Sequence, residues 1–168
     1  DTFFKCALEM EKIEEIQFLV VGEGGLLSHY KSEYSCLSNI TFAPKVLKSE
    51  VPSVLNLCDL LYFSVHCSKV WQFGQSLNKV VDYMQSGTPI VASYSGYPSM
   101  INEARCGSFV PSGNVGELRN EIVRYFSMKE DTRQKIGVRG QQWILKNRTF
   151  KKLASDFLKI LFPQSTSY

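Results

Sequence analysis

The apolar residues of this chain gather in short runs, and segments with helical spacing lie between them. Runs rich in β-branched and aromatic residues occupy residues 18–21 (FLVV), 60–65 (LLYFSV), 89–93 (PIVAS) and 108–110 (SFV), and a weaker run occupies residues 39–43 (NITFA). Runs that are apolar almost throughout are typical of strands covered on both faces. The pattern therefore predicts five buried strands.

Three of the intervening segments place apolar residues on one side of a helix. Their stripes consist of Phe3, Phe4, Ala7, Leu8 and residues 10–13, then Val80, Val81 and Met84, then Leu118, Ile122, Tyr125 and Phe126. Because each parallel connection needs a helix-length crossover, the alternation predicts an α/β fold. We expect a Rossmann-like, doubly wound parallel sheet with helices on both faces. Ligands bind such sheets at the carboxyl ends of the strands.

From Lys129 onward the pattern becomes basic and helical. The apolar positions are Trp143, Ile144, Phe150, Leu153, Phe157, Leu158 and Leu161, and the basic positions are Arg133, Lys135, Arg139, Lys146, Arg148, Lys151 and Lys152. This segment is interpreted as closing C-terminal helices with a solvated basic face. The alternative is that the basic face meets an anionic membrane surface. The last residues, from Pro163, are expected to fray.

Composition narrows the class of protein. With 168 residues, of which 44% are hydrophobic, the chain can bury the core of a single domain. A net charge of +3 is too small to indicate a nucleic-acid partner, and the chain has no apolar run of the roughly 20 residues that span a bilayer. The five cysteines include no C-x-x-C pair, so they are interpreted as reduced, mostly buried thiols of a cytosolic protein. Neither histidine has metal-ligand spacing, and no metal site is expected.

Two loops after predicted strands carry candidate binding groups. In VVGEGG (20–25), Gly22 and Gly24 either let the backbone approach a ligand or make a tight turn. In FAPKV (42–46), Pro44 has no N–H and ends a strand ladder, which frees main-chain groups near Ala43 and Lys45. A planar base would hydrogen-bond to such groups; a simple turn is the alternative.

A third candidate lies in the segment FGQSLNKVVDYMQSGTPIVAS (73–93). Ser76 is predicted to be the N-cap of a helix that begins near Asn78, and free N–H groups at a helix start bind anions. Lys79 opposes the helix dipole there unless an anion such as a diphosphate is bound. Asp82, one turn further, can accept hydrogen bonds from vicinal hydroxyls. Alternatively, Lys79 and Asp82 are a solvent-facing pair.

The order of these motifs resembles the C-terminal, nucleotide-sugar-binding domain of family-4 retaining glycosyltransferases with the GT-B fold. The resemblance extends from Asp1 to about Phe157. Its most specific part, S-x-N-K-x-x-D-Y-M-x-x-G-x-P-I-V at residues 76–91, is similar to the form found in bacterial transferases of O-antigen and other cell-surface polysaccharides. The resemblance implies that the chain is the C-terminal half of a GT-B fold.

The resemblance also assigns roles to the third loop. In the family, two acidic residues frame the donor site. The second falls on Asp82 and implies a contact to the ribose hydroxyls. The first falls on Gly74, which has no carboxylate, so Gln75 or a main-chain group is expected to substitute near the sugar. The diphosphate falls on the N–H groups of Asn78 and Lys79. From the residues themselves we expect a catalytic role for Lys79, which would offset charge on the leaving diphosphate together with the helix N–H groups.

The base-contacting turn of the family falls on Ala43 and Lys45, with Gly22 and Gly24 in the neighbouring loop. The family places a strand, an arginine and a lysine ahead of a helix that resembles DTFFKCALEM. The resemblance thus implies that residues 1–168 are a donor-binding domain cut from a longer enzyme, without its N-terminal acceptor domain.

These implications lead to a functional hypothesis. We expect a hexosyltransferase that takes a UDP-hexose or UDP-N-acetylhexosamine and transfers the sugar to a lipid-linked saccharide in lipopolysaccharide or O-antigen synthesis. No cofactor beyond the donor substrate is expected, and this part alone is expected to be inactive. The expected location is the bacterial cytoplasm, with peripheral contact to the inner face of the membrane. Two alternatives stay open, a GT-B-type UDP-sugar epimerase and a nonenzymatic Rossmann-like interaction domain.

Overall fold

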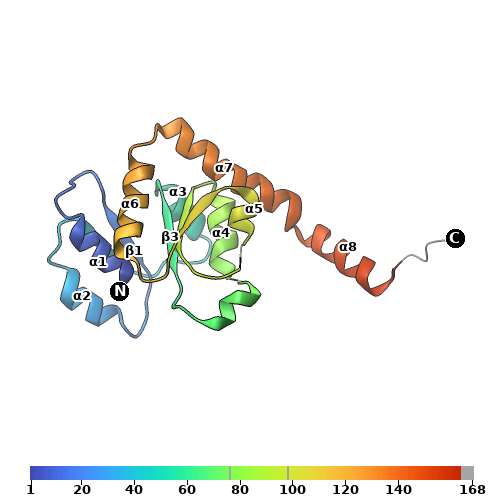
Figure 1. The fold of residues 1–168 in the computed structure, drawn as a ribbon, viewed down its shortest axis with the longest axis horizontal. Coiled ribbons are helices and arrows are strands. Elements are labelled where there is room, and N and C mark those ends of the chain that lie inside the picture. The colour runs from blue at the N-terminus through green and yellow to red at the C-terminus, as the bar shows by residue number, and fades with distance from the viewer. Residues whose placement is uncertain (76, 98, 164–168) are drawn as a thin grey trace.

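Strands and helices alternate along the chain in the computed structural model, which describes residues 1–75, 77–97 and 99–163 (Figure 1). The elements are α1 (Thr2–Glu9), β1 (Phe18–Val21), α2 (Leu27–Tyr34), β2 (Ile40–Ala43), α3 (Val51–Asn56), β3 (Leu61–Ser64), the 3-10 helix η1 (Lys69–Phe73), α4 (Asn78–Ser86), β4 (Ile90–Ser93), α5 (Met100–Ala104), β5 (Gly107–Val110), α6 (Val115–Phe126), α7 (Glu130–Asn147) and α8 (Phe150–Leu161). The five predicted strands and the three predicted helices are confirmed. The first helix ends at Glu9 and so does not include residues 10–13 of its apolar stripe. Leu8, another residue of the stripe, is half exposed.

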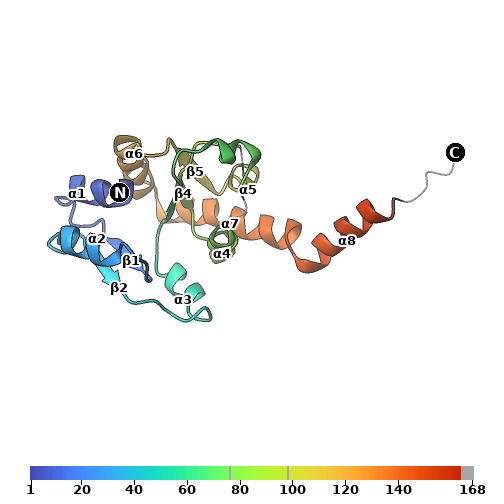
Figure 2. The same cartoon turned by 90° about the horizontal axis from the view of Figure 1, so that it is seen from below.

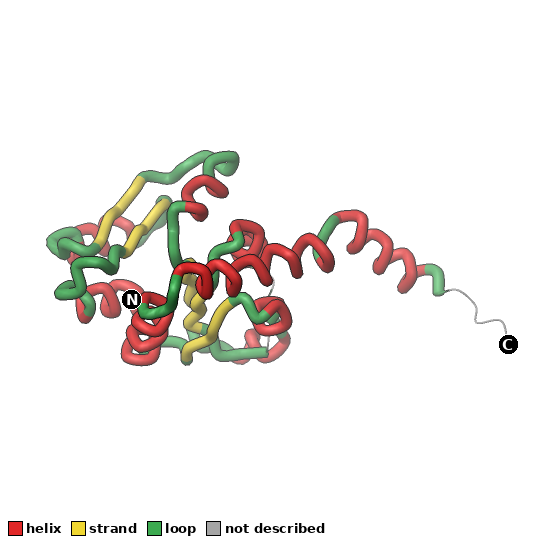
Figure 3. Tube along the Cα trace, turned by 90° about the horizontal axis from the view of Figure 1, so that it is seen from above, coloured by secondary structure: helices red, strands yellow, loops and turns green. Residues whose placement is uncertain are grey.

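All the strand pairs are parallel, as the sequence predicts. β1 pairs with β2, with Phe18 opposite Ile40. β4 lies between β3 and β5, with Ile90 opposite both Leu61 and Gly107. The pairing makes two sheets instead of one, β1-β2 and β3-β4-β5, and Figure 3 shows the strands in two separate groups.

Helices cover both faces of the three-stranded sheet. The side chains of β4 alternate: Ile90 and Ala92 point into one cluster of buried residues, and Val91 points into another. The first cluster includes Met84 of α4, and the second includes Leu118 of α6. Because a central strand is buried on both faces, its apolar run is continuous. The doubly wound, Rossmann-like α/β fold is therefore confirmed.

An aromatic contact connects the two sheets. Phe3 of α1 lies with its ring centroid 5.2 Å from that of Phe18 in β1 and 5.5 Å from that of Tyr62 in β3. Val91 of β4 belongs to the same buried cluster as Phe18. The two sheets consequently share one cluster of buried apolar residues.

The two C-terminal helices behave differently. α7 packs closely on α4, and a Cβ added at Gly137 would lie 1.8 Å from the main-chain oxygen of Gly87. α8 buries none of its residues and extends away from the body of the molecule (Figure 2). The predicted closing role thus belongs to α7. None of the helices described between residues 1 and 163 is long and apolar enough to cross a membrane.

The five cysteines are free thiols, as predicted. Cys6 and Cys106 are buried, and burial raises the pKa of the Cys6 thiol to about 12 and the pKa of the Cys106 thiol to about 11. The prediction that the thiols are mostly buried is wrong, because Cys36 and Cys67 are exposed and Cys58 is only partly covered. The exposed pair lies outside the strands and helices that build the core.

Candidate functional site

The loops that follow β1 and β2 lie together. Gly22 has φ 137°, a conformation that favours glycine, and its N–H extends the strand ladder to the main-chain oxygen of Ala43 at 3.4 Å. Lys45 Nζ lies 2.5 Å from Glu23 Oε1, so an exposed ion pair joins the two loops. The structure therefore brings Gly22, Ala43 and Lys45 into one place at the carboxyl ends of two parallel strands.

Gly24 and Pro44 are consistent with simple turns, which were the alternative to a contact with a ligand. Gly24 is exposed, and its main-chain oxygen accepts the N–H of Leu27 at the start of α2. β2 ends at Ala43, directly before Pro44. Among the described residues, no hydrogen bond uses the main-chain N–H of Lys45. That donor is the one a planar base could take.

The second group of candidate residues surrounds the start of α4. The helix begins at Asn78, as predicted, and Leu77 holds the position before it. Ser76, the predicted N-cap, lies outside the described residues. Asn78 and Lys79 are exposed, and within the described chain no side chain caps this helix start. Free N–H groups at the positive end of a helix form an anion site.

Lys79 and Asp82 do not form an ion pair with each other, which was the alternative to a role in binding. In the described part of the chain, neither side chain has an ion-pair or hydrogen-bond partner. Asp82 is partly buried and follows Asn78 by four residues, which places both on the same side of α4. A cation, free N–H groups and a carboxylate thus lie along the first turns of one helix.

Neighbouring residues fix the orientation of α4. The Tyr83 hydroxyl donates to the main-chain oxygen of Tyr62 in β3 at 3.3 Å. Burial raises the pKa of Tyr83, so the hydroxyl keeps its proton and remains a donor at neutral pH. Gly87 ends the helix with φ 75°, a left-handed cap that returns the chain to β4. Asp82 is therefore held at a defined position on the helix.

Gly74 and Gln75 lie in the connection between η1 and α4. Gly74 has φ 103° and ψ −174°, and a Cβ added there would meet nothing within 4 Å. The positive φ explains why residue 74 is a glycine, because a side chain there would have enough space. Both amide atoms of Gln75 are buried without a hydrogen-bond partner in the described structure. An unsatisfied buried polar group costs about 1–3 kcal/mol, so a ligand that bonds this amide would recover stability.

Aromatic residues that the site predictions do not include hold this connection in place. The Tyr94 hydroxyl lies within hydrogen-bond distance of two main-chain oxygens, 3.1 Å from that of Trp71 and 3.0 Å from that of Tyr97. The Tyr97 N–H donates to the Trp71 oxygen at 2.8 Å. A Cβ added at Gly96 would lie 2.5 Å from that oxygen. The tyrosines that flank this glycine in SYSGY are a sequence signal that could have revealed the contact.

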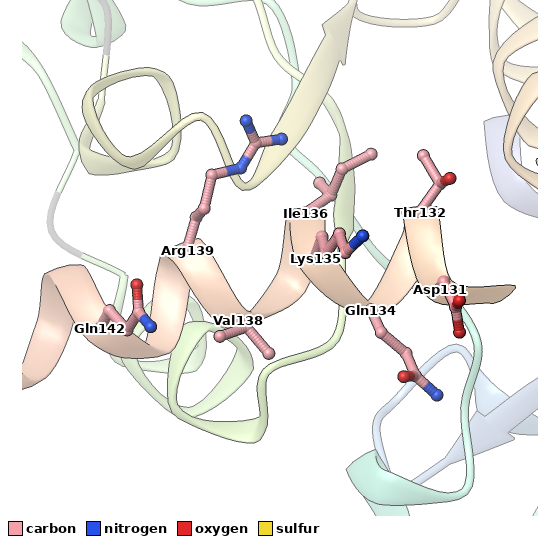
Figure 4. A pocket seen from close by; sticks show the side chains of 8 residues that line it. All are labelled: Asp131, Thr132, Gln134, Lys135, Ile136, Val138, Arg139 and Gln142. Carbon is pink, nitrogen blue, oxygen red and sulfur yellow. The ribbon is translucent and has the colours of Figure 1, made fainter.

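The two groups of candidate residues occupy the carboxyl ends of strands in different sheets. Among the described residues, no hydrogen bond or ion pair joins Gly22, Ala43 or Lys45 to the group around α4. A hollow elsewhere is lined by eight residues of α7 between Asp131 and Gln142, and their side chains leave the helix in several directions (Figure 4). It contains none of the candidate residues. The described chain also brings together no group of three His, Cys, Asp or Glu side chains that could hold a metal.

The fold is that of solved glycosyltransferases. The structure is similar to WaaG, a glycosyltransferase involved in lipopolysaccharide biosynthesis, with a TM-score of 0.67 and 13% identity over 95% of this chain and 42% of that one. It is similar to HepE from Anabaena in complex with UDP, with a TM-score of 0.69 and 17% identity over 95% of this chain and 44% of that one. The chain thus spans less than half the length of these two proteins.

The family follows from the sequence itself. Residues 2–128 match the family described as glycosyl transferases group 1, and this match covers most of the chain. The chain belongs to that family. A third similar structure is the C-terminal domain of the group 1 protein LpcC from Francisella tularensis, with a TM-score of 0.66 and 15% identity over 89% of this chain and 78% of that one. No curated protein matches the sequence.

Proposed function

We propose that this chain is the donor-binding domain of a retaining, family-4 GT-B glycosyltransferase that takes a UDP-sugar. The observation that carries the proposal is the start of α4, where N–H groups of exposed residues and Lys79 lie beside the Asp82 carboxylate, which has no ion-pair partner among the described residues. Family membership supports it. So do the structures of HepE, which hold UDP and UDP-glucose.

In the proposed reaction these groups act on the leaving nucleotide. The N–H groups of Asn78 and Lys79 bind the diphosphate, and the Lys79 ammonium offsets the negative charge that develops as the sugar departs. Asp82 accepts the ribose hydroxyls and does not act as a general base. Ala43 and Lys45 receive the base, with Gly22 and Gly24 in the neighbouring loop. The buried amide of Gln75, next to Gly74, contacts the donor sugar. No metal or cofactor takes part.

The domain organisation belongs to the same proposal. A longer enzyme would carry an acceptor-binding domain, and the difference in length from WaaG and HepE supports this. The division of the strands into two parallel sheets supports a further strand between β1 and β3, connected to α1. That strand would bring the arginine and lysine that complete the donor site. Residues 1–168 alone would bind UDP without catalysis.

The acceptor is proposed to be a lipid-linked saccharide of bacterial surface polysaccharide synthesis, and the donor a UDP-hexose or UDP-N-acetylhexosamine. The match of residues 76–91 to the O-antigen type of motif supports this, and so does the similarity to WaaG. The enzyme would then work in the cytoplasm, at the inner face of the membrane.

Titration of UDP and of uridine by isothermal calorimetry tests the donor site. Asp82→Ala should weaken both ligands about tenfold or more, since a hydrogen bond to a charged group contributes about 1.5–3 kcal/mol. Lys79→Ala should weaken UDP but not uridine, because only UDP carries the diphosphate. Asp131→Ala, which removes an exposed carboxylate from the distant helix α7, should change neither affinity.

Two results would contradict the proposal. Equal UDP affinities of wild type and Asp82→Ala would remove the ribose contact and favour an interaction domain. An equal loss of UDP and uridine binding in a Lys79→Ala variant that keeps the wild-type melting temperature would remove the diphosphate contact of Lys79.

A further inference from the structure

The main-chain oxygen of Trp71 in η1 is the acceptor of three hydrogen-bond donors. The N–H of Gly74 donates to it at 3.2 Å, and the N–H of Tyr97 donates to it at 2.8 Å. The third donor is the Tyr94 hydroxyl, at 3.1 Å. One carbonyl oxygen thus joins η1 both to the connection at residues 74–75 and to the loop that follows β4.

The side chain of Trp71 is fixed as well. Its Nε1–H donates to the main-chain oxygen of His66, in the loop after β3, at 2.8 Å. Its ring lies edge-on to the ring of Tyr94, with the centroids 6.2 Å apart. Because Trp71 is bound through both its side chain and its main chain, it ties the loop after β3 to the loop after β4.

Tyr94 is anchored in the core beneath these loops. It is 5% exposed, and its ring lies 5.4 Å, between centroids, from that of Phe109 in β5. Its hydroxyl has a second acceptor, the main-chain oxygen of Tyr97, at 3.0 Å. A Cβ added at Gly96 would lie 2.6 Å from this hydroxyl. Hydrogen bonds in such a buried place are stronger than in water, so the hydroxyl can hold its neighbours in position.

We propose that Tyr94 is a positioning residue of the donor site, which holds residues 74 and 75 where they receive the donor sugar. It acts through the Trp71 oxygen, to which the Gly74 N–H is bonded. Gly74 has no side chain that could restrict its backbone, so this connection depends on outside contacts for a single conformation. The inference rests on the proposed function, which assigns the sugar to Gln75.

The nucleotide contacts of the proposed site are held in a different way. α4 is oriented by the Tyr83 hydroxyl, which donates to the main-chain oxygen of Tyr62, and by the fully buried side chain of Val80. Neither contact involves the Trp71 oxygen. Loss of the Tyr94 hydroxyl should therefore weaken the contact to the sugar and leave the contacts to the nucleotide nearly unchanged.

Isothermal calorimetry on the 168-residue chain tests the inference, with UDP, UDP-glucose and UDP-N-acetylglucosamine as ligands. Tyr94→Phe removes the hydroxyl and keeps the ring. It should weaken whichever UDP-sugar the wild type binds more tightly by about threefold or more, the effect of one hydrogen bond, and should leave the UDP affinity nearly unchanged. Gly96→Ala should have the same selective effect, because its Cβ would lie 2.5 Å from the Trp71 oxygen and displace it.

Tyr125→Phe is the matched control. Tyr125 is 2% exposed, and its hydroxyl lies 2.9 Å from Ser108 Oγ, so this substitution removes a buried hydroxyl of the same kind from α6. A structural loss alone would lower the melting temperature of both variants. Only Tyr94→Phe should weaken the UDP-sugar more than UDP.

Hydrogen exchange of the Gly74 amide is a second readout, because this N–H donates to the Trp71 oxygen. We expect its exchange to become about threefold faster or more in Tyr94→Phe. In Tyr125→Phe the rate should stay that of the wild type.

Three results would overturn the inference. These are an equal change of UDP and UDP-sugar affinity in Tyr94→Phe, an unchanged exchange rate of the Gly74 amide in that variant, and a wild type that binds UDP but neither UDP-sugar. Each would remove the role of Tyr94 alone, provided that Asp82→Ala still weakens UDP. If the wild type does not bind UDP, the donor site itself is refuted, whatever the exchange of the Gly74 amide shows.

Discussion

Single residues of the candidate site differ in how well the sequence foretells their surroundings. The helix start at Asn78 follows from residue types and spacing. The sequence leaves open whether Lys79 and Asp82 pair with each other. The conformation of Gly74 does not follow from the sequence, because a positive φ depends on how η1 and α4 are joined in space. This conformation gives a physical reason for the missing carboxylate, since a glutamate at residue 74 would be strained.

At the residue scale we predict the reactivity of the thiols. A thiol reagent at pH 8 should modify the exposed Cys36 and Cys67 quickly, and the buried Cys6 and Cys106 only after unfolding. Because pH 8 is well below the raised pKa values of the two buried thiols, they stay protonated and unreactive in the folded chain. Mass spectrometry of time points measures the order of modification. Modification of Cys6 in the folded chain at the rate of Cys36 would contradict its burial.

The raised pKa of Cys6 also predicts that the free energy of unfolding depends on pH. The Cys6 pKa rises from its ordinary value of 9.0 to about 12 on folding, so the folded state holds the proton more tightly. The stabilising contribution is complete below pH 9 and is lost as the pH rises from 9 toward 12. Urea unfolding at pH 8 and pH 10.5 should show a lower free energy of unfolding at the higher pH. A smaller loss is expected in Cys6→Ala.

At the scale of elements, the contact between α4 and α7 depends on glycine. The absence of a side chain at Gly137 lets α7 approach the main chain of Gly87, and Gly140 lies in the same way against Cys106. The sequence shows a basic helix with two glycines but not which element they face. The partner is decided by the crossing of the helices.

We predict opposite effects of two glycine substitutions. Gly137→Ala places a Cβ 1.8 Å from a main-chain oxygen and should destabilise the chain by about 1–3 kcal/mol, because the helices must move apart. Gly116→Ala in α6 meets only a side-chain atom at 3.7 Å and should be neutral or stabilise by up to about 1 kcal/mol. Thermal unfolding measures both. Equal melting temperatures of the two variants would rule out the tight α4–α7 contact.

At the scale of the whole molecule, the two sheets depend on α1 for their connection. Phe3 contacts Phe18 of one sheet and Tyr62 of the other. The sequence predicts that Phe3 is buried against the sheet, but not that it joins two sheets. Its role arises because β1 and β3 do not pair.

We predict that Phe3→Ala loosens β1 and β2 more than the other strands. The loss should be about 2 kcal/mol, below the 3–5 kcal/mol of a fully buried phenylalanine, since Phe3 is only partly buried. Hydrogen exchange should show faster exchange in 18–21 and 40–43 than in 90–93. Phe73→Ala, at a side chain that is 90% exposed, is the control and should leave exchange unchanged. Uniform loss of protection in Phe3→Ala would contradict a connecting role.

The sequence by itself determined the strands, the parallel α/β class, the family and the residue types at the start of α4. These are local properties, set by apolar periodicity, helix-start chemistry and a continuous motif. Only the tertiary structure decided that the strands divide into two sheets, that α7 closes the core while α8 does not, and that the Gln75 amide is buried with no partner among the described residues. Each of these depends on which distant elements meet, and contacts between distant residues leave no periodic signal in the chain.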